Sequence, residues 1–251
     1  MNYQSWIAHF HANRANRVEP DWDAPSTLDE MQRRALALSL AEYQLGDGGG
    51  PCRLIARDAE QYRGQAEEIR TVVDLWFNEE REHSRLLGGA VRRLRGEFVT
   101  STFAFRLFNA CRRALGVQFE MLVLLLVEIV STGYYRVIRR HCGDAPILAM
   151  CRLILRDEAG HIRFHRDRLA AWYPQGVGRS WRWRFHLLGL ACAAFLWLGH
   201  GRWLRAIGAT RPEFFLYVRA GLRTFLNGFA ALASRSSGTA LAVMPSPLPL
   251  R

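Results

Sequence analysis

The chain has 251 residues, 49% of them hydrophobic and 23% charged, which allows a globular core and excludes bulk disorder. Its net charge of +11 favours partners that carry phosphate, acidic groups or anionic lipid, although a GC-rich coding bias toward arginine would produce the same excess. The five cysteines contain no CxxC pair, which indicates reduced thiols. Residues 1–23 show no signal-peptide pattern, so we expect a cytoplasmic protein.

The chain order predicts a series of helices. Residues 1–26 are polar, with prolines at 20 and 25, and we expect an irregular lead-in. A helix begins at Ser26 or Thr27, with acids in its first turn, and runs to about Gln44. The glycine-rich run 46–51 alone would predict a loop. Further helical periodicity covers 53–94 (with a break near 62–64), 98–115, 117–140, 147–172, 183–206 and 212–234.

These segments divide the chain into four parts. We expect the lead-in (1–26), a helical bundle (27–174), additional helices packing on it (175–234) and a flexible tail (235–251). The apolar run Phe185–Leu198 is shorter than the roughly 20 residues that a spanning helix needs, which favours a buried bundle helix. An interfacial membrane helix is the alternative, because several tryptophans in and beside this run lie among arginines: Trp181, Trp183, Trp197 and Trp203.

Two segments carry the same carboxylate–imidazole motif. They are Glu80-x-x-His83 and Glu158-x-x-His161. Residues three apart lie on one face of a helix, so each motif offers one carboxylate and one imidazole to the same point. This donor set suits iron or manganese better than copper or structural zinc. A single motif carries little weight, whereas two of them predict a shared metal site.

Glu128 is the leading candidate for a carboxylate from a neighbouring helix. It lies in the apolar run Met121–Val130. Burying an unpaired carboxylate is costly, and a metal ion would compensate its charge directly. Pairing with an arginine, or exposure at a subunit edge, is the alternative explanation.

A fourth carboxylate ligand is expected if the two halves of the bundle share the same spacing between ligands. Glu128 precedes Glu158 by 30 positions, and an internal repeat would place its counterpart 30–38 positions before Glu80. Asp47 lies 33 positions before Glu80, and Glu42 lies 38 before it. Asp47 fits the spacing better, whereas Glu42 lies on a clearer helix.

The choice between them decides where the first helix ends. If Asp47 is the ligand, the run 46–51 continues the helix and the turn falls near 62–64. Either choice gives one carboxylate from each of two helices and Glu-x-x-His from the other two, the donor set of ferritin-like di-iron bundles. The sequence therefore predicts an all-α, ferritin-like four-helix bundle with additional C-terminal helices.

Four runs of the chain carry a family resemblance. They are Tyr43–Asp47, Phe77–His83, Glu128–Tyr135 and Ile154–His165. They resemble the corresponding runs of the bacterial ferritin-like-domain proteins, and the similarity covers roughly residues 30–170. The superfamily includes acyl-carrier desaturases, arylamine N-oxygenases and ribonucleotide reductase small subunits, and the resemblance implies two iron ions, or an iron/manganese pair. The family has Gly-Glu after Gln-Leu, so Asp47 stands as a shorter substitute.

Residues beside the motifs have further candidate roles. His165 lies four residues after His161 and is a weaker candidate ligand, since arylamine N-oxygenases have an extra histidine. Asp157 and Glu79 are expected to hydrogen-bond the ligating imidazoles or to face solvent. Tyr134 and Tyr135 are expected to be packed or hydrogen-bonded rather than redox-active.

The expected function is that of an O2-activating di-iron oxidoreductase acting on a small-molecule or carrier-bound substrate, with an unidentified electron donor. One alternative is a ferroxidase or other iron-handling protein. Another is a basic helical protein that binds a membrane surface or a partner and keeps a vestigial site. We expect no nucleic-acid partner, since the chain has no recognisable nucleic-acid motif. Peripheral membrane contact and a homodimer are both compatible with the sequence.

Overall fold

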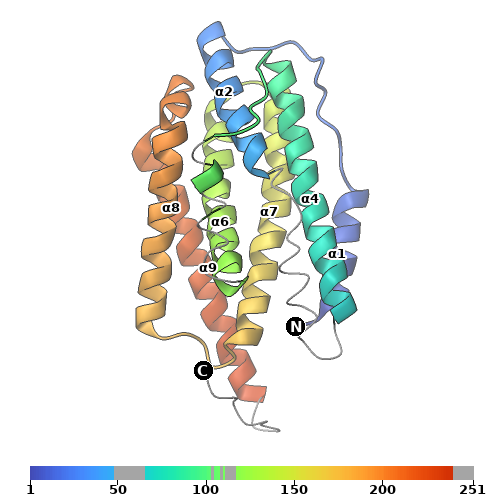
Figure 1. The fold of residues 1–251 in the computed structure, drawn as a ribbon, viewed down its shortest axis with the longest axis vertical. Helices are drawn as coiled ribbons and strands as arrows, with labels where there is room; N and C mark the ends of the chain where they lie inside the picture. Colours follow the sequence, from blue (N-terminus) through green and yellow to red (C-terminus); the bar gives the residue numbers. More distant parts are fainter. Residues whose placement is uncertain (48–65, 103–104, 108–109, 111–116, 240–251) are drawn as a thin grey trace.

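The computed structural model describes the chain except residues 48–65, 103–104, 108–109, 111–116 and 240–251. At residues 47, 66, 117–118 and 233–239 it describes the backbone alone. All regular elements in the described part are helices, which confirms the all-α prediction (Figure 1). They are α1 (Tyr3–Ala15), α2 (Glu30–Asp47), α4 (Ala66–Arg93), α6 (Val117–His141), α7 (Ala145–Trp172), α8 (Arg179–Ala206) and α9 (Arg211–Thr239).

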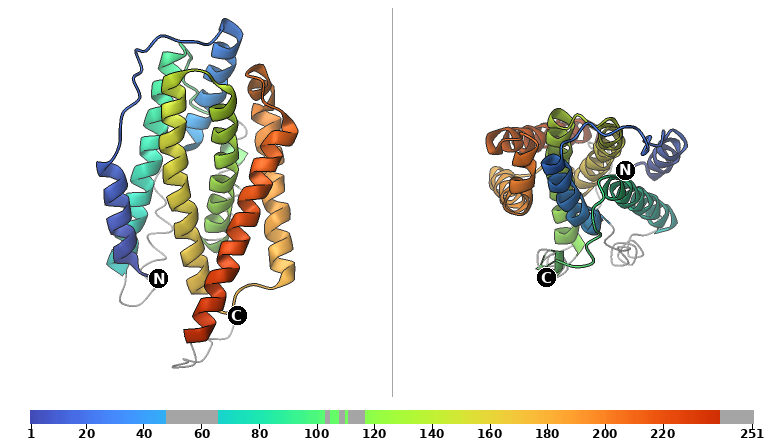
Figure 2. Two further views of the ribbon diagram at one scale, coloured as in Figure 1. Left: turned by 180° about the vertical axis from the view of Figure 1, so that it is seen from behind. Right: turned by 90° about the horizontal axis from the view of Figure 1, so that it is seen from above.

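The centre of the molecule is a bundle of α2, α4, α6 and α7. The helices pack in pairs, α2 against α4 and α6 against α7, and α4 also contacts α7. The hairpin of α8 and α9 packs on the α6 side of this bundle, and α1 lies on the opposite side against α4 (Figure 2). The three helices α4, α6 and α7 therefore enclose a common interior.

One buried ion pair holds the end of α4 against the beginning of α7. Asp144 caps α7 by accepting a hydrogen bond from the Ile147 amide. Both of its oxygens also accept from Arg93 near the end of α4, at 2.9 and 2.8 Å. A charged fork of this kind combines geometric precision with strength. It sets the register between the two helices that carry the Glu-x-x-His motifs.

Among the described residues, two helices are long and apolar enough to cross a membrane by length and composition alone. The first is the Phe119–His141 part of α6, and 78% of its apolar 18-residue window is buried inside the bundle. A helix in the core of a bundle passes this test without crossing a membrane. The second is α8, and only 28% of its apolar window is buried. The expectation that this helix is buried was therefore wrong, because only one of its faces packs on the bundle.

The expectation that residues 1–26 form an irregular lead-in was also wrong. Residues 1–26 include α1, whose Trp6 and Phe10 lie one turn apart and are buried against Phe164 of α7. With so few apolar positions, the helix has almost no sequence signature. The close approach of α1 to α7 depends on Gly160, since a Cβ atom there would lie 2.6 Å from the His9 ring.

The glycine-rich run behaves differently from a plain loop. Helix α2 continues through Gly46 and Asp47. The rest of the run, the expected break near 62–64 and residues 240–251 of the expected tail lie outside the described residues. So do residues 103–104, 108–109 and 111–115 of the expected helix 98–115, whereas its first residues, 98–102, are not helical. Helix α9 continues to Thr239, so the first part of the expected tail, residues 235–239, is helical.

Candidate metal centre

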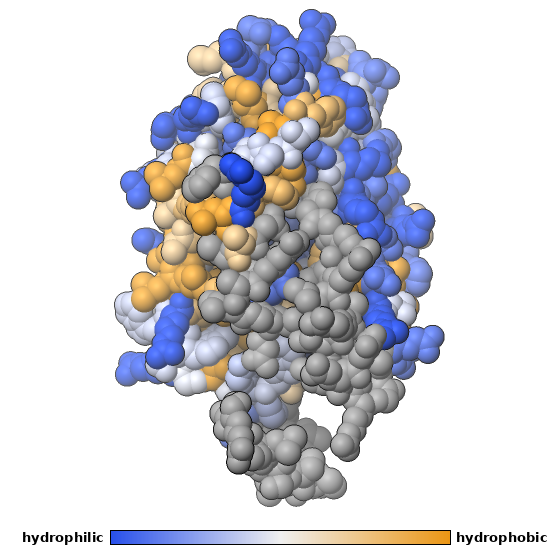
Figure 3. All heavy atoms as spheres, viewed as in Figure 1, coloured by the Kyte–Doolittle hydropathy of each residue, from blue (hydrophilic) through white to orange (hydrophobic). Residues whose placement is uncertain are grey.

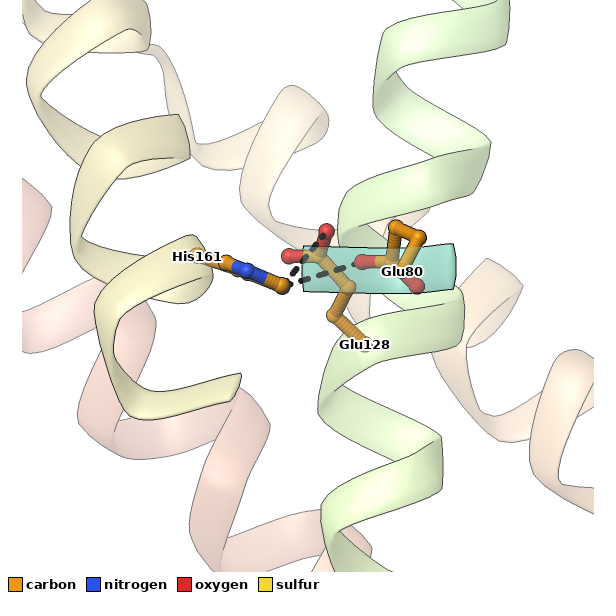
Figure 4. A group of neighbouring side chains, drawn as sticks. All are labelled: Glu80, Glu128 and His161. Carbon is orange, nitrogen blue, oxygen red and sulfur yellow. Dashed lines mark ion pairs between the residues drawn. The ribbon is translucent and has the colours of Figure 1, made fainter. Parts of the chain in front are cut away.

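Three side chains from three helices meet inside the bundle. Glu80 of α4, Glu128 of α6 and His161 of α7 each offer a ligand atom, and these atoms lie within 4.8 Å of one another (Figure 4). The Nδ1 atom of His161 is 3.0 Å from Glu80 Oε1 and 3.8 Å from Glu128 Oε1. The apolar run around Glu128 thus delivers its carboxylate to the two motif helices.

The remaining motif residues surround this group. His83 Nδ1 lies 3.8 Å from Glu80 Oε2 and 3.9 Å from Glu158 Oε1. Glu158 Oε2 lies 3.8 Å from His161 Nδ1. His165, the weaker candidate, has its Nε2 atom 3.3 Å from Glu128 Oε1. The structure therefore brings both Glu-x-x-His motifs, Glu128 and His165 together.

The two candidates for the fourth carboxylate lie in different places. Glu42 Oε2 lies 4.0 Å from His200 of α8, away from the motif histidines. The side chain of Asp47 lies outside the described residues. Helices α2 and α4 run antiparallel, since Arg33 donates to the Leu94 carbonyl and Gln44 donates to Ser84 at 2.9 Å. Extending this register to the last turn of α2 pairs position 47 with positions 80–81 of α4.

A second carboxylate holds the outer nitrogen of each motif imidazole. His83 Nε2 on α4 is 3.1 Å from Asp157 Oδ2 on α7. In the reverse direction, His161 Nε2 on α7 is 2.9 Å from Glu79 Oε2 on α4. The predicted hydrogen bonds are confirmed, and each runs between helices. With Nε2 turned outward to its carboxylate, the Nδ1 atom of each imidazole faces the carboxylates of the interior. In the neutral form of the ring, this Nδ1 atom would carry the lone pair.

Arg17, in the segment after α1, neutralises the two outer carboxylates. Its guanidinium is hydrogen-bonded to Asp157 and lies 3.9 Å from Glu79 Oε1. Arg156 also donates to Asp157. No sequence pattern points to Arg17, since its partner lies 140 residues away. Trp76, one turn before Glu80, donates to Glu80 Oε1 at 3.1 Å, and this spacing could have been noticed.

The pKa values of several side chains in the centre depart from their ordinary values. Burial raises the pKa of Glu128 above its usual range. For Glu80 burial acts in the same direction, but the nearby imidazoles of His161 and His83 lower its pKa below its usual range. Burial alone would lower the pKa of His83, but its hydrogen bond to Asp157 and the nearby Glu80 carboxylate raise it to about 10. Protonated imidazoles thus balance the carboxylates, in positions where a metal cation would do the same.

Several inward-facing atoms have no hydrogen-bond partner among the described residues. They include both carboxylate oxygens of Glu128, His83 Nδ1 and His165 Nε2. Orphaned buried polar atoms are rare, and each is costly unless an ion or water satisfies it. Oxygen and imidazole donors converging in this way fit a divalent iron or manganese ion.

The two tyrosines on α6 are packed, as expected, and Tyr134 is also hydrogen-bonded. Both are fully buried, and the Tyr134 hydroxyl lies 2.8 Å from Ser39 Oγ. Ser39 in turn lies 2.9 Å from His200 Nδ1, and the Tyr43 ring stacks on Tyr134. These contacts join α2, α6 and α8 at a level separate from the carboxylates.

Comparison with known proteins adds no identity to this geometry. No protein-family model, no curated protein and no solved structure matches the chain.

Proposed function

We propose that the chain is an O2-activating non-haem di-iron oxidoreductase with a ferritin-like bundle, resident in the cytoplasm. Two iron ions, or an iron/manganese pair, would be held by Glu80, His83, Glu128, Glu158 and His161, with Asp47 completing the set and His165 as an additional donor. The observation that carries the proposal is the convergence of both Glu-x-x-His motifs and Glu128 on one buried point.

The bound metals would supply the electrons and the Lewis acidity for O2 activation and for oxidation of an organic substrate. The chain's own residues prepare that site. Asp157 and Glu79 fix the imidazole tautomers so that Nδ1 faces inward. Arg17 forms an ion pair with Asp157 and lies 3.9 Å from Glu79, which places a positive charge beside both outer carboxylates.

An aromatic wall limits access of water from the α1 side. Trp76, Phe10 and Phe164 are buried, and the Phe10 and Trp76 ring centroids each lie 6.1 Å from that of His161. A site shielded from water protects a strong oxidant from side reactions. Such shielding supports an oxidase or oxygenase over an iron store, whose metal must enter and leave. The substrate would be a small molecule or a carrier-bound group.

Anaerobic reconstitution with Fe²⁺ tests the proposal. Wild type, Glu128→Ala and the surface control Glu82→Ala would each be loaded, and metal counted per chain before exposure to O2. We expect about two irons per chain and an O2-dependent near-ultraviolet absorbance in wild type and the control, with both lost in Glu128→Ala. Absence of stoichiometric binding with Fe²⁺, Mn²⁺ and Zn²⁺ would contradict the proposal. Steady Fe²⁺ oxidation with release of Fe³⁺ would identify an iron-handling protein instead.

A further inference from the structure

Positive charge is concentrated in the last third of the chain. Residues 168–251 contain eleven arginines and a single acidic residue, Glu213, and so carry +10 of the net +11. Glu213 is itself paired with His141 at 2.6 Å and with Arg140 at 3.1 Å. The α8–α9 hairpin, which lies at the edge of the molecule in Figure 2, is therefore a strongly cationic addition to a nearly neutral bundle.

The outer face of α8 is apolar in its middle and cationic at both ends. Side chains at spacings of three and four form one exposed stripe, defined by Arg184, Leu187, Ala191, Phe195, Leu198, Arg202 and Arg205. Within it, Leu187 is 52% exposed, Phe195 49% and Leu198 82%. The opposite face of α8 packs on the bundle. Figure 3 shows hydrophobic residues gathered on the side of the molecule where α8 lies.

Two shallow hollows on the same hairpin repeat this combination. One, of about 350 Å³, is lined by Arg211, Arg219 and apolar residues of α9. The other, of about 260 Å³, is lined by Arg179, Arg182 and Trp183, with Trp183 64% exposed. Apolar surface bounded by guanidinium groups suits a ligand that is anionic at its head and apolar behind it.

We propose that the α8–α9 hairpin docks peripherally on a membrane surface that contains anionic lipid. Exposed apolar and tryptophan side chains enter the interface between headgroups and acyl chains, while the arginines pair with lipid phosphates. A second copy of the chain fits the stripe poorly, because in an antiparallel pairing Arg184 would face Arg202 of the other copy. Docking through this hairpin does not require a metal ion in the bundle.

Vesicle flotation of the full chain tests this inference. Phosphatidylcholine vesicles would be compared with vesicles containing phosphatidylglycerol, at low and at physiological salt. Wild type would be compared with the charge variant Arg184→Gln/Arg202→Gln/Arg205→Gln and with the apolar variant Phe195→Ser/Leu198→Ser. A matched control, Arg14→Gln/Arg34→Gln/Arg92→Gln, removes the same charge from exposed positions on α1, α2 and α4.

We expect binding to anionic vesicles that weakens with salt. The charge variant should bind about 10- to 100-fold more weakly and the apolar variant should also lose binding, whereas the control binds nearly as wild type. Absence of wild-type binding, or equal losses in the charge variant and the control, would overturn the proposal. A wild-type dimer dissociated by Phe195→Ser/Leu198→Ser would assign the face to a second copy and also overturn it. Circular dichroism of every variant separates lost binding from lost folding.

Discussion

The Nε2 atom of His83 on α4 lies 3.1 Å from a carboxylate oxygen of Asp157 on α7, the residue directly before Glu158. The residue that orients the imidazole of one motif therefore directly precedes the other motif in the chain. Glu79 makes the reciprocal contact with His161. The two motifs thus support each other, and this relationship can be tested apart from the ligands.

Asp157→Asn should weaken metal binding without removing a ligand. An amide is a weaker acceptor than a carboxylate and loses the ion pair with Arg17, so His83 is held less firmly. We expect the Kd for Mn²⁺, followed by electron paramagnetic resonance titration, to rise about 10- to 100-fold. Asp167→Asn, a more exposed change on the same helix, should leave it unchanged. Equal affinities for Asp157→Asn and wild type would show that the outer carboxylate has no role in binding.

Glu128→Met should stabilise the metal-free protein while abolishing its response to metal. Neither carboxylate oxygen has a hydrogen-bond partner among the described residues, and burial raises the pKa of Glu128. Replacing it by an apolar side chain of similar length therefore removes a desolvation cost of about 1–3 kcal/mol. Thermal unfolding with and without Mn²⁺ measures both effects. The metal-free midpoint should rise by about 2–4 °C per kcal/mol. A lower midpoint would mean that Glu128 serves the fold rather than a metal.

Two glycines on α8 should respond to alanine with opposite signs. At Gly189 a Cβ atom would lie 2.6 Å from Leu222 of α9, inside a packed interface, so Gly189→Ala should cost about 1–3 kcal/mol. Gly199 has nothing within 4 Å of that position, and Gly199→Ala should add about 0.5–1 kcal/mol through helix propensity. Urea unfolding of the two variants gives the comparison. Equal effects would contradict the close packing of α8 on α9.

His200 should make the fold sensitive to mild acid. Burial lowers its pKa to about 4, although Glu42 lies 4.0 Å away, and its other neighbours Ser39, Tyr43 and Tyr134 are neutral. The unfolded chain binds the proton near pH 6.5, so stability is full above that pH and falls as pH drops toward 4. The loss should be on the order of 2–3 kcal/mol. Urea unfolding at pH 7, 5.5 and 4.5 measures this loss, and His200→Gln should remove it. An unchanged slope in that variant would exclude His200 as the cause.

The sequence predicted the helices of the bundle and of the α8–α9 hairpin, and the motif residues, because these are local signals. Helix α1 was not predicted, because it has few apolar positions. Three-residue spacing places Glu80 and His83 on one face whatever the tertiary structure, and an acid such as Glu128 in an apolar run stands out by itself. Arg17 has no such signal, because its role depends on a contact across 140 residues. The exposure of α8 was not predictable either, since hydropathy does not reveal which neighbouring helix will cover a face.

The crossed contacts between motifs also determine which positions would change together in evolution. Glu79 contacts the imidazole of His161, and Asp157 contacts that of His83. Along the chain, however, each of these carboxylates directly precedes the glutamate of the other motif: Glu79 precedes Glu80, and Asp157 precedes Glu158. If the bundle arose by duplication of a half-bundle, a substitution at Glu79 or Asp157 in one half would affect the orientation of the imidazole in the other half. Coupled substitution should therefore join the two helices rather than run along either of them.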